Sequence, residues 1–128
     1  MASGRIYEGF VPGRHAIDAY GNGGFRFGEM SHRGSILALP SGVRAWPVTQ
    51  ISELNEAALA DAFTEGDALD LLLLGTGRDI AAIPDEIRWR FRDARIGLDV
   101  MQTGAAARTY NILLAENRKV GAALIAVA

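Results

Sequence analysis

The sequence predicts an α/β domain whose second half has the order strand, helix, strand, helix, strand. Leu69–Leu74 is apolar at almost every position, which is typical of a strand buried on both faces of a parallel sheet. The segments 83–94 and 103–116 carry apolar side chains at the three- and four-residue spacing of amphipathic helices. In the first half, Asn22-Gly23 fits the two-residue turn of a β-hairpin.

The first half should begin with hairpin strands. Residues 1–14 are rich in glycine and proline and show no period, so we expect a partly ordered lead-in, followed by a single domain over residues 15–128. Strands should flank the Asn22-Gly23 turn, because this dipeptide tolerates positive φ angles. Further strands are expected at Ser35–Leu39 and Val43–Trp46.

One helix is predicted to follow these strands. Ser52 can cap its first amides, and Gly66 stands where the helix should end. The apolar stripe that predicts it consists of Leu54, Ala58, Leu59, Ala62 and Phe63.

The rest of the chain alternates strands and helices. Pro84 suits the first turn of the second helix, which should end before the strand Leu98–Met101. Thr103 can cap a third helix, which Asn117 can close in the left-handed conformation. Val120–Val127 is the last expected strand. Because a helix joins each of these strands to the next, we expect them to be parallel.

Composition excludes several functional classes. With 49% hydrophobic and 22% charged residues, the 128-residue chain matches an ordinary globular domain. A net charge of −2 disfavours nucleic acid as a partner. The absence of cysteine excludes disulfides, thiolate nucleophiles and cysteine metal sites, and it fits a cytoplasmic location. Apolar runs fall far short of the roughly 20 residues of a spanning helix, so we expect neither membrane insertion nor export.

Two loops are expected at one edge of the parallel sheet, where open α/β folds bind ligands. One follows Leu74, and the other precedes the third helix, whose free amides can hold an anion. The alternative is that the glycines only allow tight turns, and that the polar residues of the helix are solvated. The predicted ligand-binding residues are Gly75, Thr76, Gly77, Arg78, Thr103, Gly104, Arg108 and Asn111.

The second helix offers a candidate surface for binding a protein partner. Arg88, Arg92 and Arg95 share one face, and Trp89 lies off the buried stripe. Arginine and tryptophan are enriched at the energetic centres of protein interfaces. The alternative is a solvated basic face with Trp89 buried by the hairpin.

The remaining polar residues do not form a reactive constellation. His15 and His32 lack the spacing of a metal-binding helix, so we expect surface histidines and neither a metal nor a cofactor. Ser41 does not lie in a nucleophile elbow. Asp70 and Asp99 interrupt apolar strands near their beginnings, where capping of backbone amides or pairing with arginine is the expected role.

Several motifs follow an order known from one family. They are the hairpin with Tyr20-Gly21, the strand Gly34–Leu37 ending in Pro40, Trp46, Leu74–Gly77 and the run Met101–Glu116. Together they resemble the family of mitochondrial complex I assembly factor 3 and its bacterial relatives, from about His15 to Ala126. The matched positions include Gly75, Gly77, Thr103, Arg108, Tyr110 and Asn111.

The resemblance implies a three-layer fold with a central mixed, mostly parallel sheet of about five strands. It also implies that no catalytic activity is established, and that mitochondrial members help to assemble complex I with partner proteins at a membrane. This chain has Ala107 where many relatives have cysteine, which argues against an essential thiol. Asn117 replaces a glycine of many relatives, and both residues accept the left-handed cap.

We therefore expect a bacterial cytoplasmic accessory protein that is not an enzyme and acts through an unidentified protein partner. A homodimer through an edge strand or an exposed helix face is a further expectation, because small sheets leave edges to cover. The alternative is a small-molecule or anion-binding protein, or an enzyme, that uses the crevice formed by Gly75–Arg78 and Thr103–Arg108.

Overall fold

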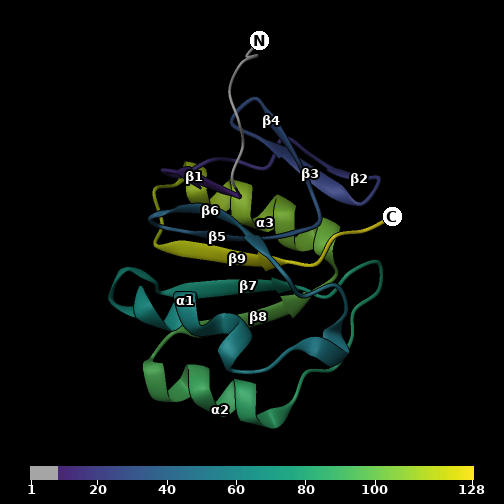
Figure 1. The fold of residues 1–128 in the computed structure, drawn as a ribbon. Coiled ribbons are helices and arrows are strands. Elements are labelled where there is room, and N and C mark those ends of the chain that lie inside the picture. The colour runs from purple at the N-terminus through teal and green to yellow at the C-terminus, as the bar shows by residue number, and fades with distance from the viewer. Residues whose placement is uncertain (1–8) are drawn as a thin grey trace.

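The protein, described over residues 9–128 in a computed structural model, contains a six-stranded main sheet and a three-stranded small sheet (Figure 1). The order of strands in the main sheet is β1 (Phe10–Pro12), β6 (Gly42–Trp46), β5 (Ser35–Leu39), β9 (Val120–Leu124), β7 (Leu71–Gly75) and β8 (Gly97–Met101). The small sheet consists of β2 (Ala19–Gly21), β3 (Gly24–Phe27) and β4 (Met30–Arg33).

Within residues 9–128, three α-helices and three short 3-10 segments complete the fold. The α-helices are α1 (Ala60–Thr64), α2 (Asp85–Ala94) and α3 (Thr103–Ala115). The 3-10 segments are η1 (Ile51–Glu53), η2 (Ala57–Leu59) and η3 (Gly66–Ala68). From β7 onward the order is strand, helix, strand, helix, strand, which confirms the prediction for the second half of the chain.

The main sheet is mixed, as predicted, but parallel pairing covers only one part of it. β7 pairs in parallel with β8 on one side and with β9 on the other. The pairs β9–β5, β5–β6 and β6–β1 are antiparallel. The sheet therefore has one strand more than expected and is not mostly parallel, because the last strand joins the hairpin β5–β6 to the parallel unit.

The main sheet separates two apolar cores, which gives the expected three layers. On one face, α1 and α2 pack on the sheet through residues such as Ala62, Ile87 and Phe91. On the other face, α3 and the small sheet pack through Ala106, Tyr110 and Phe27. In Figure 1, α2 lies next to β8 at one end of the molecule and the small sheet lies at the opposite end.

The hairpin predicted at Asn22-Gly23 is confirmed. The two residues have φ angles of 53° and 79° and connect β2 to β3. The amide of Gly23 also donates a hydrogen bond to the carbonyl of Val127, at 2.8 Å. The small sheet is thereby connected to the segment that follows β9.

The continuous helix predicted after Ser52 is wrong. Glu53 reaches back to accept hydrogen bonds from the amide and hydroxyl of Thr49, and Leu54 is extended with ψ 127°. Asn55 then accepts a bond from the amide of Ala58 and begins a new turn. These side chain-to-backbone bonds compete with helix formation and divide the segment into η1, η2 and the five-residue α1.

Two strands lie where none was predicted. The lead-in expected over residues 1–14 contributes β1, which pairs with β6 at the edge of the main sheet, while residues 1–8 lie outside the described part. His32, expected on the surface, belongs to β4 and is buried, with Nε2 3.1 Å from the carbonyl oxygen of Ser35. Within residues 9–128, no helix has the length and apolar character needed to cross a membrane.

Candidate functional site

Thr103 closes the crevice that was predicted at the carboxyl ends of the parallel strands. Its hydroxyl donates a hydrogen bond to the carbonyl of Ile125 at 2.7 Å and accepts one from the amide of Gly77 at 3.0 Å. Its own amide donates to the carbonyl of Gly77 at 2.8 Å. Because the side chain is fully buried, these groups hold the protein together and are not open to a ligand.

Gly75 and Thr76 contribute to the same closure. A Cβ atom on Gly75 would lie 2.8 Å from Cα of Thr103, so only glycine allows this close approach of the two loops. The amide of Thr76 donates to the carbonyl of Met101 at 2.9 Å, and its hydroxyl donates to the carbonyl of Asp79 at 2.6 Å. The structure therefore brings these predicted residues together, in the arrangement expected for a tight turn.

The first turn of α3 is also covered. Gln102, and not Thr103, provides the cap, because its side chain accepts from the amide of Gly104 at 3.1 Å. A Cβ atom on Gly104 would collide with the hydroxyl of Tyr20, so this phenol packs directly on the helix start. Arg108 is exposed, and it faces away from the closed loops because it lies two residues from the buried Tyr110.

Asn111 binds the backbone of the protein itself. Its Oδ1 accepts from the amide of Ile17 and its Nδ2 donates to the carbonyl of Ile17, both at 2.8 Å. This pair of bonds fixes the segment before β2 to α3. The side-chain amide of Asn111 therefore forms its hydrogen bonds within the fold, and it does not extend into the predicted crevice.

A hollow remains on the other side of the glycine loop. It has a volume of about 410 Å³, and Arg78 at its rim is exposed. The predicted loop thus borders a hollow whose other walls are formed by residues 49–51 and 125–128. Thr103, Gly104 and Arg108, which were predicted to share a site with this loop, do not line it. The lining residues are Thr49, Gln50, Ile51, Thr76, Gly77, Arg78, Ile125, Ala126, Val127 and Ala128.

The second predicted site, on α2, lies at the surface. Ile87 and Phe91 are buried against the core, while 59% of Trp89 on the opposite side of the helix is exposed. The guanidinium of Arg92 stacks over the indole, 4.7 Å from the ring centre. Trp89 is therefore exposed and not buried by the hairpin, and the cation of Arg92 holds its ring.

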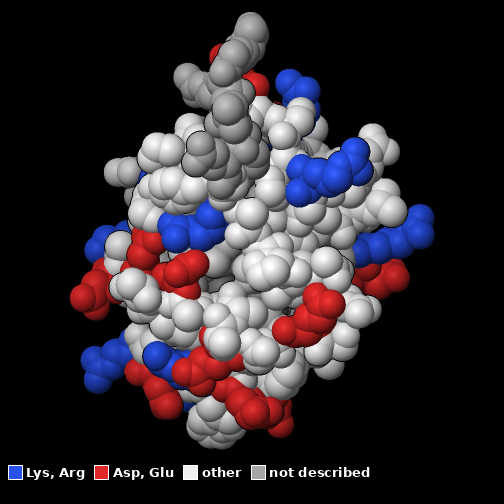
Figure 2. All heavy atoms as spheres, in the orientation of Figure 1, with Lys and Arg blue, Asp and Glu red and all other residues white. Residues whose placement is uncertain are grey.

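The arginines of α2 fall into two groups. Arg90 bonds Glu56 at 3.0 Å and stacks over the ring of Phe63 at 4.1 Å, so it fixes α2 to α1 and η2. Within residues 9–128, Arg88 and Arg95 form no ion pair, and both are exposed. Figure 2 shows that carboxylates also gather on the lower half of the molecule, where α1 and α2 lie. On α2 itself, the exposed acidic residues are Asp85, Glu86 and Asp93.

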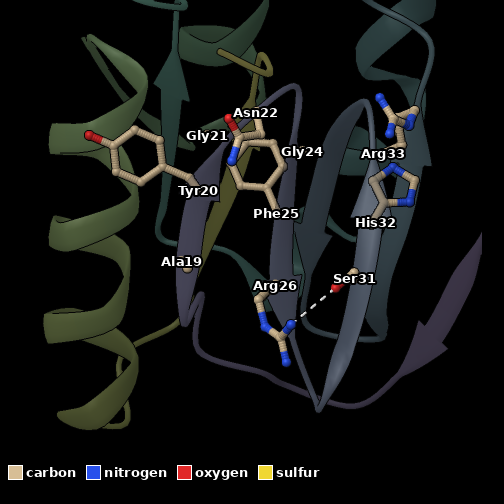
Figure 3. Close-up of a pocket in the computed structure, with 10 residues that line it drawn as sticks. All are labelled: Ala19, Tyr20, Gly21, Asn22, Gly24, Phe25, Arg26, Ser31, His32 and Arg33. Atoms are coloured by element: carbon tan, nitrogen blue, oxygen red, sulfur yellow. Dashed lines mark hydrogen bonds between the residues drawn. The ribbon is translucent and has the colours of Figure 1, made fainter. Parts of the chain in front are cut away.

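The small sheet carries a hollow that sequence reasoning missed. It has a volume of about 410 Å³, and Figure 3 shows Arg26 and Arg33 extending from adjacent strands beside it. The floor between them is formed by the small residues Gly24 and Ser31. The hydroxyl of Ser31 accepts a long hydrogen bond from Arg26, at 3.3 Å. The alternation Gly24-x-Arg26 and Ser31-x-Arg33 was the available signal, because it places all four residues on one face.

The other polar candidates are not joined into a reactive site. Asp70 and Asp99 are exposed. Ser41 bonds Glu65 through its amide at 2.9 Å and through its hydroxyl, which fixes the β5–β6 turn to α1. The described residues contain no group of three or more His, Asp or Glu that could hold a metal ion. Burial raises the pKa of the Tyr110 hydroxyl to about 12, which keeps this phenol protonated.

Residues 17–125 match the model of a protein family of unknown function, DUF498/DUF598. The chain belongs to this family. The match covers every element from the small sheet to β9, and it includes the closed loops and the outer face of α2. The DUF498/DUF598 family is therefore the family that the motifs of the sequence resembled.

Curated relatives of this DUF498/DUF598 protein include an assembly factor. An uncharacterized protein from Rhodobacter capsulatus is 39% identical over 109 residues, which cover 85% of this chain and 82% of that protein. NADH dehydrogenase [ubiquinone] 1 alpha subcomplex assembly factor 3 from Drosophila melanogaster is 31% identical over 112 residues. That alignment covers 85% of this chain but 57% of the assembly factor, so the chain spans little more than half of the relative's length.

A solved structure agrees with the fold. The crystal structure of an outer membrane protein from Bartonella henselae has a TM-score of 0.87 and 49% sequence identity, covering 91% of this chain and 98% of the other. The DUF498/DUF598 chain therefore shares its mixed α/β architecture with bacterial relatives as well as its sequence with assembly factors.

Proposed function

We propose that the protein is a non-enzymatic accessory factor that assists the assembly of a protein complex by binding a protein partner. Trp89 is the observation that carries the proposal. A large indole is 59% exposed on a helix whose opposite face is buried, and Arg92 holds it in place. Exposed aromatic and arginine side chains in such an arrangement are typical centres of interfaces. The relationship to assembly factor 3 supports the same function.

The proposed contact surface is the outer face of α2, and we define it by Arg88, Trp89, Arg92 and Arg95. Nothing in the core depends on these side chains, because the helix is anchored by Ile87, Phe91 and Arg90. Substitutions on this face should therefore leave the fold intact, as is usual for exposed positions.

The test is affinity capture of the tagged protein from its own cells, followed by mass spectrometry. We expect a specific protein partner that is lost with Trp89→Ala and with Arg88→Glu/Arg92→Glu. Arg33→Glu, which reverses an exposed charge on the small sheet, is the matched control and should retain the partner. Thermal unfolding should show that all variants are folded. Retention of the partner by both α2 variants would contradict the proposal.

The alternative is binding of a small anionic molecule at the hollow beside Arg78. Its support is the exposed guanidinium at the rim of a hollow of about 410 Å³. Against it, Thr103 and Gly75 fill the space between the two predicted loops. A small molecule that co-purifies with the wild type and is lost with Arg78→Ala, in the absence of a protein partner, would favour the alternative.

A further inference from the structure

The outer edge of β8 is unpaired within the described part of the chain. The inner edge pairs with β7, since the amide of Gly97 donates to Asp70 and the carbonyl of Met101 accepts from Thr76. Backbone groups of successive residues in a strand point to opposite sides. The amides and carbonyls of Leu98 and Val100 therefore point outward, where no described strand meets them. β8 thus presents a row of free hydrogen-bonding groups.

The two edges of the main sheet differ. The opposite edge strand, β1, has three residues and includes Pro12, which has no amide hydrogen to donate. β8 has five residues and no proline, and its Gly97 and Asp99 are exposed. Proteins usually protect such an edge by proline, short length or a covering element. Charged side chains are a further protection, and among the described residues β8 has only this one, in the exposed Asp99, while α2 packs on one face of the sheet beside it.

The outer face of α2 borders this edge on one side of the sheet. Arg90 lies on the flank of α2 that packs on α1, and α1 in turn bonds the β5–β6 turn through Glu65. Residues two positions away on a helix lie on the opposite side, which places Arg88 and Arg92 on the other flank. Because β8 lies at the opposite end of the sheet from β6, that flank faces the free edge.

An apolar strip borders the edge on the other side of the sheet. The hydroxyl of Thr109 lies 3.8 Å from the sulfur of Met101, so α3 runs directly beside β8. Ile112 follows one helical turn after Thr109 and is 54% exposed. The free edge therefore lies between a basic flank on one face and, on the other, Met101 and Ile112 together with the exposed carboxylate of Asp99, which shares the face of Met101.

We propose that the edge of β8 accepts an extended segment of a partner protein as a seventh strand, and that this segment carries acidic side chains. Successive side chains of a strand face opposite sides of the sheet. Acidic residues would then meet Arg88 and Arg92, and the alternate residues would meet Met101 and Ile112 beside the carboxylate of Asp99, which disfavours acidic residues on that face. The proposal rests on the proposed function and names the chemistry of the partner at that surface.

Charge selects an acidic partner over a second copy of this chain. None of Arg88, Arg92 and Arg95 has a carboxylate partner within residues 9–128, whereas Arg90 on the other flank is paired. Antiparallel pairing of two β8 edges about a twofold axis would place both α2 helices on the same face of the joined sheet. Their basic flanks would then face one another, and this repulsion disfavours the homodimer.

The first test uses a defined peptide and the wild-type protein. A synthetic peptide that alternates Glu with Val should bind at least about tenfold more tightly than the same peptide with Lys in place of Glu, because the flank of α2 is basic. Methylation of the peptide nitrogens that face β8 should weaken binding about tenfold or more, because strand addition depends on backbone hydrogen bonds. Chemical shifts of the labelled protein should locate binding at Leu98 and Val100.

The second test uses variants of the edge. Val100→Pro removes one outward amide, and proline is tolerated on an edge strand when its nitrogen faces solvent. Val100→Thr is the matched control, which changes the side chain and keeps the amide. Val100→Pro should weaken binding of the Glu-Val peptide about tenfold and Val100→Thr should not. The methylated peptide provides an independent answer if the proline variant fails to fold.

Each outcome bears on the proposal. Equal binding of the acidic and basic peptides, or binding insensitive to methylation, would overturn it. A dimer in sedimentation that dissociates with Val100→Pro would show that a second copy occupies the edge, and would also overturn it. Loss of the captured partner with Trp89→Ala but not with Val100→Pro would leave the proposed function standing and would reject strand addition.

Discussion

The hydroxyl of Thr103 closes the crevice at the carboxyl ends of the parallel strands. It donates to Ile125 and accepts from Gly77, and it does so without exposure to solvent. Sequence position alone favoured this residue as a helix cap beside an open crevice. The structure gives the cap to Gln102 instead, so Thr103 is free to bond the two neighbouring loops.

Replacement of Thr103 by valine should destabilise the protein by about 2–4 kcal/mol, because it leaves the buried carbonyl of Ile125 and the buried amide of Gly77 without a partner. Urea unfolding measures the effect. Thr109→Val is the matched control on the same helix, since the hydroxyl of Thr109 contacts only the sulfur of Met101, at 3.8 Å. A loss of less than about 0.5 kcal/mol for Thr103→Val would contradict the role assigned here.

Both longer helices are followed by a residue other than glycine in the left-handed conformation, Arg95 after α2 and Asn117 after α3. Arg95 has a φ angle of 60°, while its amide bonds the carbonyl of Arg92 and the next amide bonds Phe91. These two bonds satisfy the last carbonyls of the helix, and the position that makes them is usually glycine.

Arg95→Gly should therefore raise the free energy of unfolding by about 0.5–1 kcal/mol, as relief of left-handed strain outweighs the extra entropy of glycine in the unfolded chain. Arg95→Ala removes the same charge and keeps the strain, so it serves as the comparison. Chemical denaturation of the three proteins measures both effects. If the glycine variant is no more stable than the alanine variant, strain at this helix end is negligible.

The elements that the sequence predicted best are those with strong periodicity. The apolar run that became β7 and the stripes of α2 and α3 left little choice of structure. The segment after Ser52 was predicted wrongly, although its apolar spacing is helical. There, Thr49–Glu53 and Asn55–Ala58 hydrogen bonds interrupt the helix, and such local competition is invisible in a hydrophobic pattern.

The candidate sites were predictable to different degrees. The basic and aromatic outer face of α2 follows from helical spacing, and only the exposure of Trp89 needed the structure. The crevice depended on how closely two loops approach, which Gly75 and Thr103 decide through tertiary contacts. The role of Asn111 was likewise hidden, because its partner Ile17 lies 94 residues away in the chain.

At the scale of the whole molecule, Tyr110 couples stability to alkaline pH. Burial raises the pKa of its hydroxyl to about 12, against about 10 in an unfolded chain, and the charge of Arg14 lowers it only in part. The native state therefore holds this proton more tightly. The stability that the protonated Tyr110 contributes is fully present below about pH 10 and is lost as the pH rises through about 12.

The free energy of unfolding should fall by about 2–3 kcal/mol across this range because of Tyr110. Other groups also titrate there, so the informative quantity is the difference between wild type and Tyr110→Phe, measured by denaturant unfolding at each pH. As the pH rises, the free energy of unfolding of the wild type should fall relative to that of Tyr110→Phe. A difference that is constant across the range would show that the phenol ionises as easily in the native state as in the unfolded chain.

The position of β9 has a consequence for how the protein is made. β9 lies between β5 and β7 in the sheet but follows β5, β6, β7 and β8 in the chain, at residues 120–124. While the ribosome is still synthesising the chain, the hairpin β5–β6 and the pair β7–β8 each expose an edge that only β9 will cover. The nascent protein therefore cannot complete its sheet until that late segment emerges, and during this interval its unpaired apolar strand edges are open to aggregation.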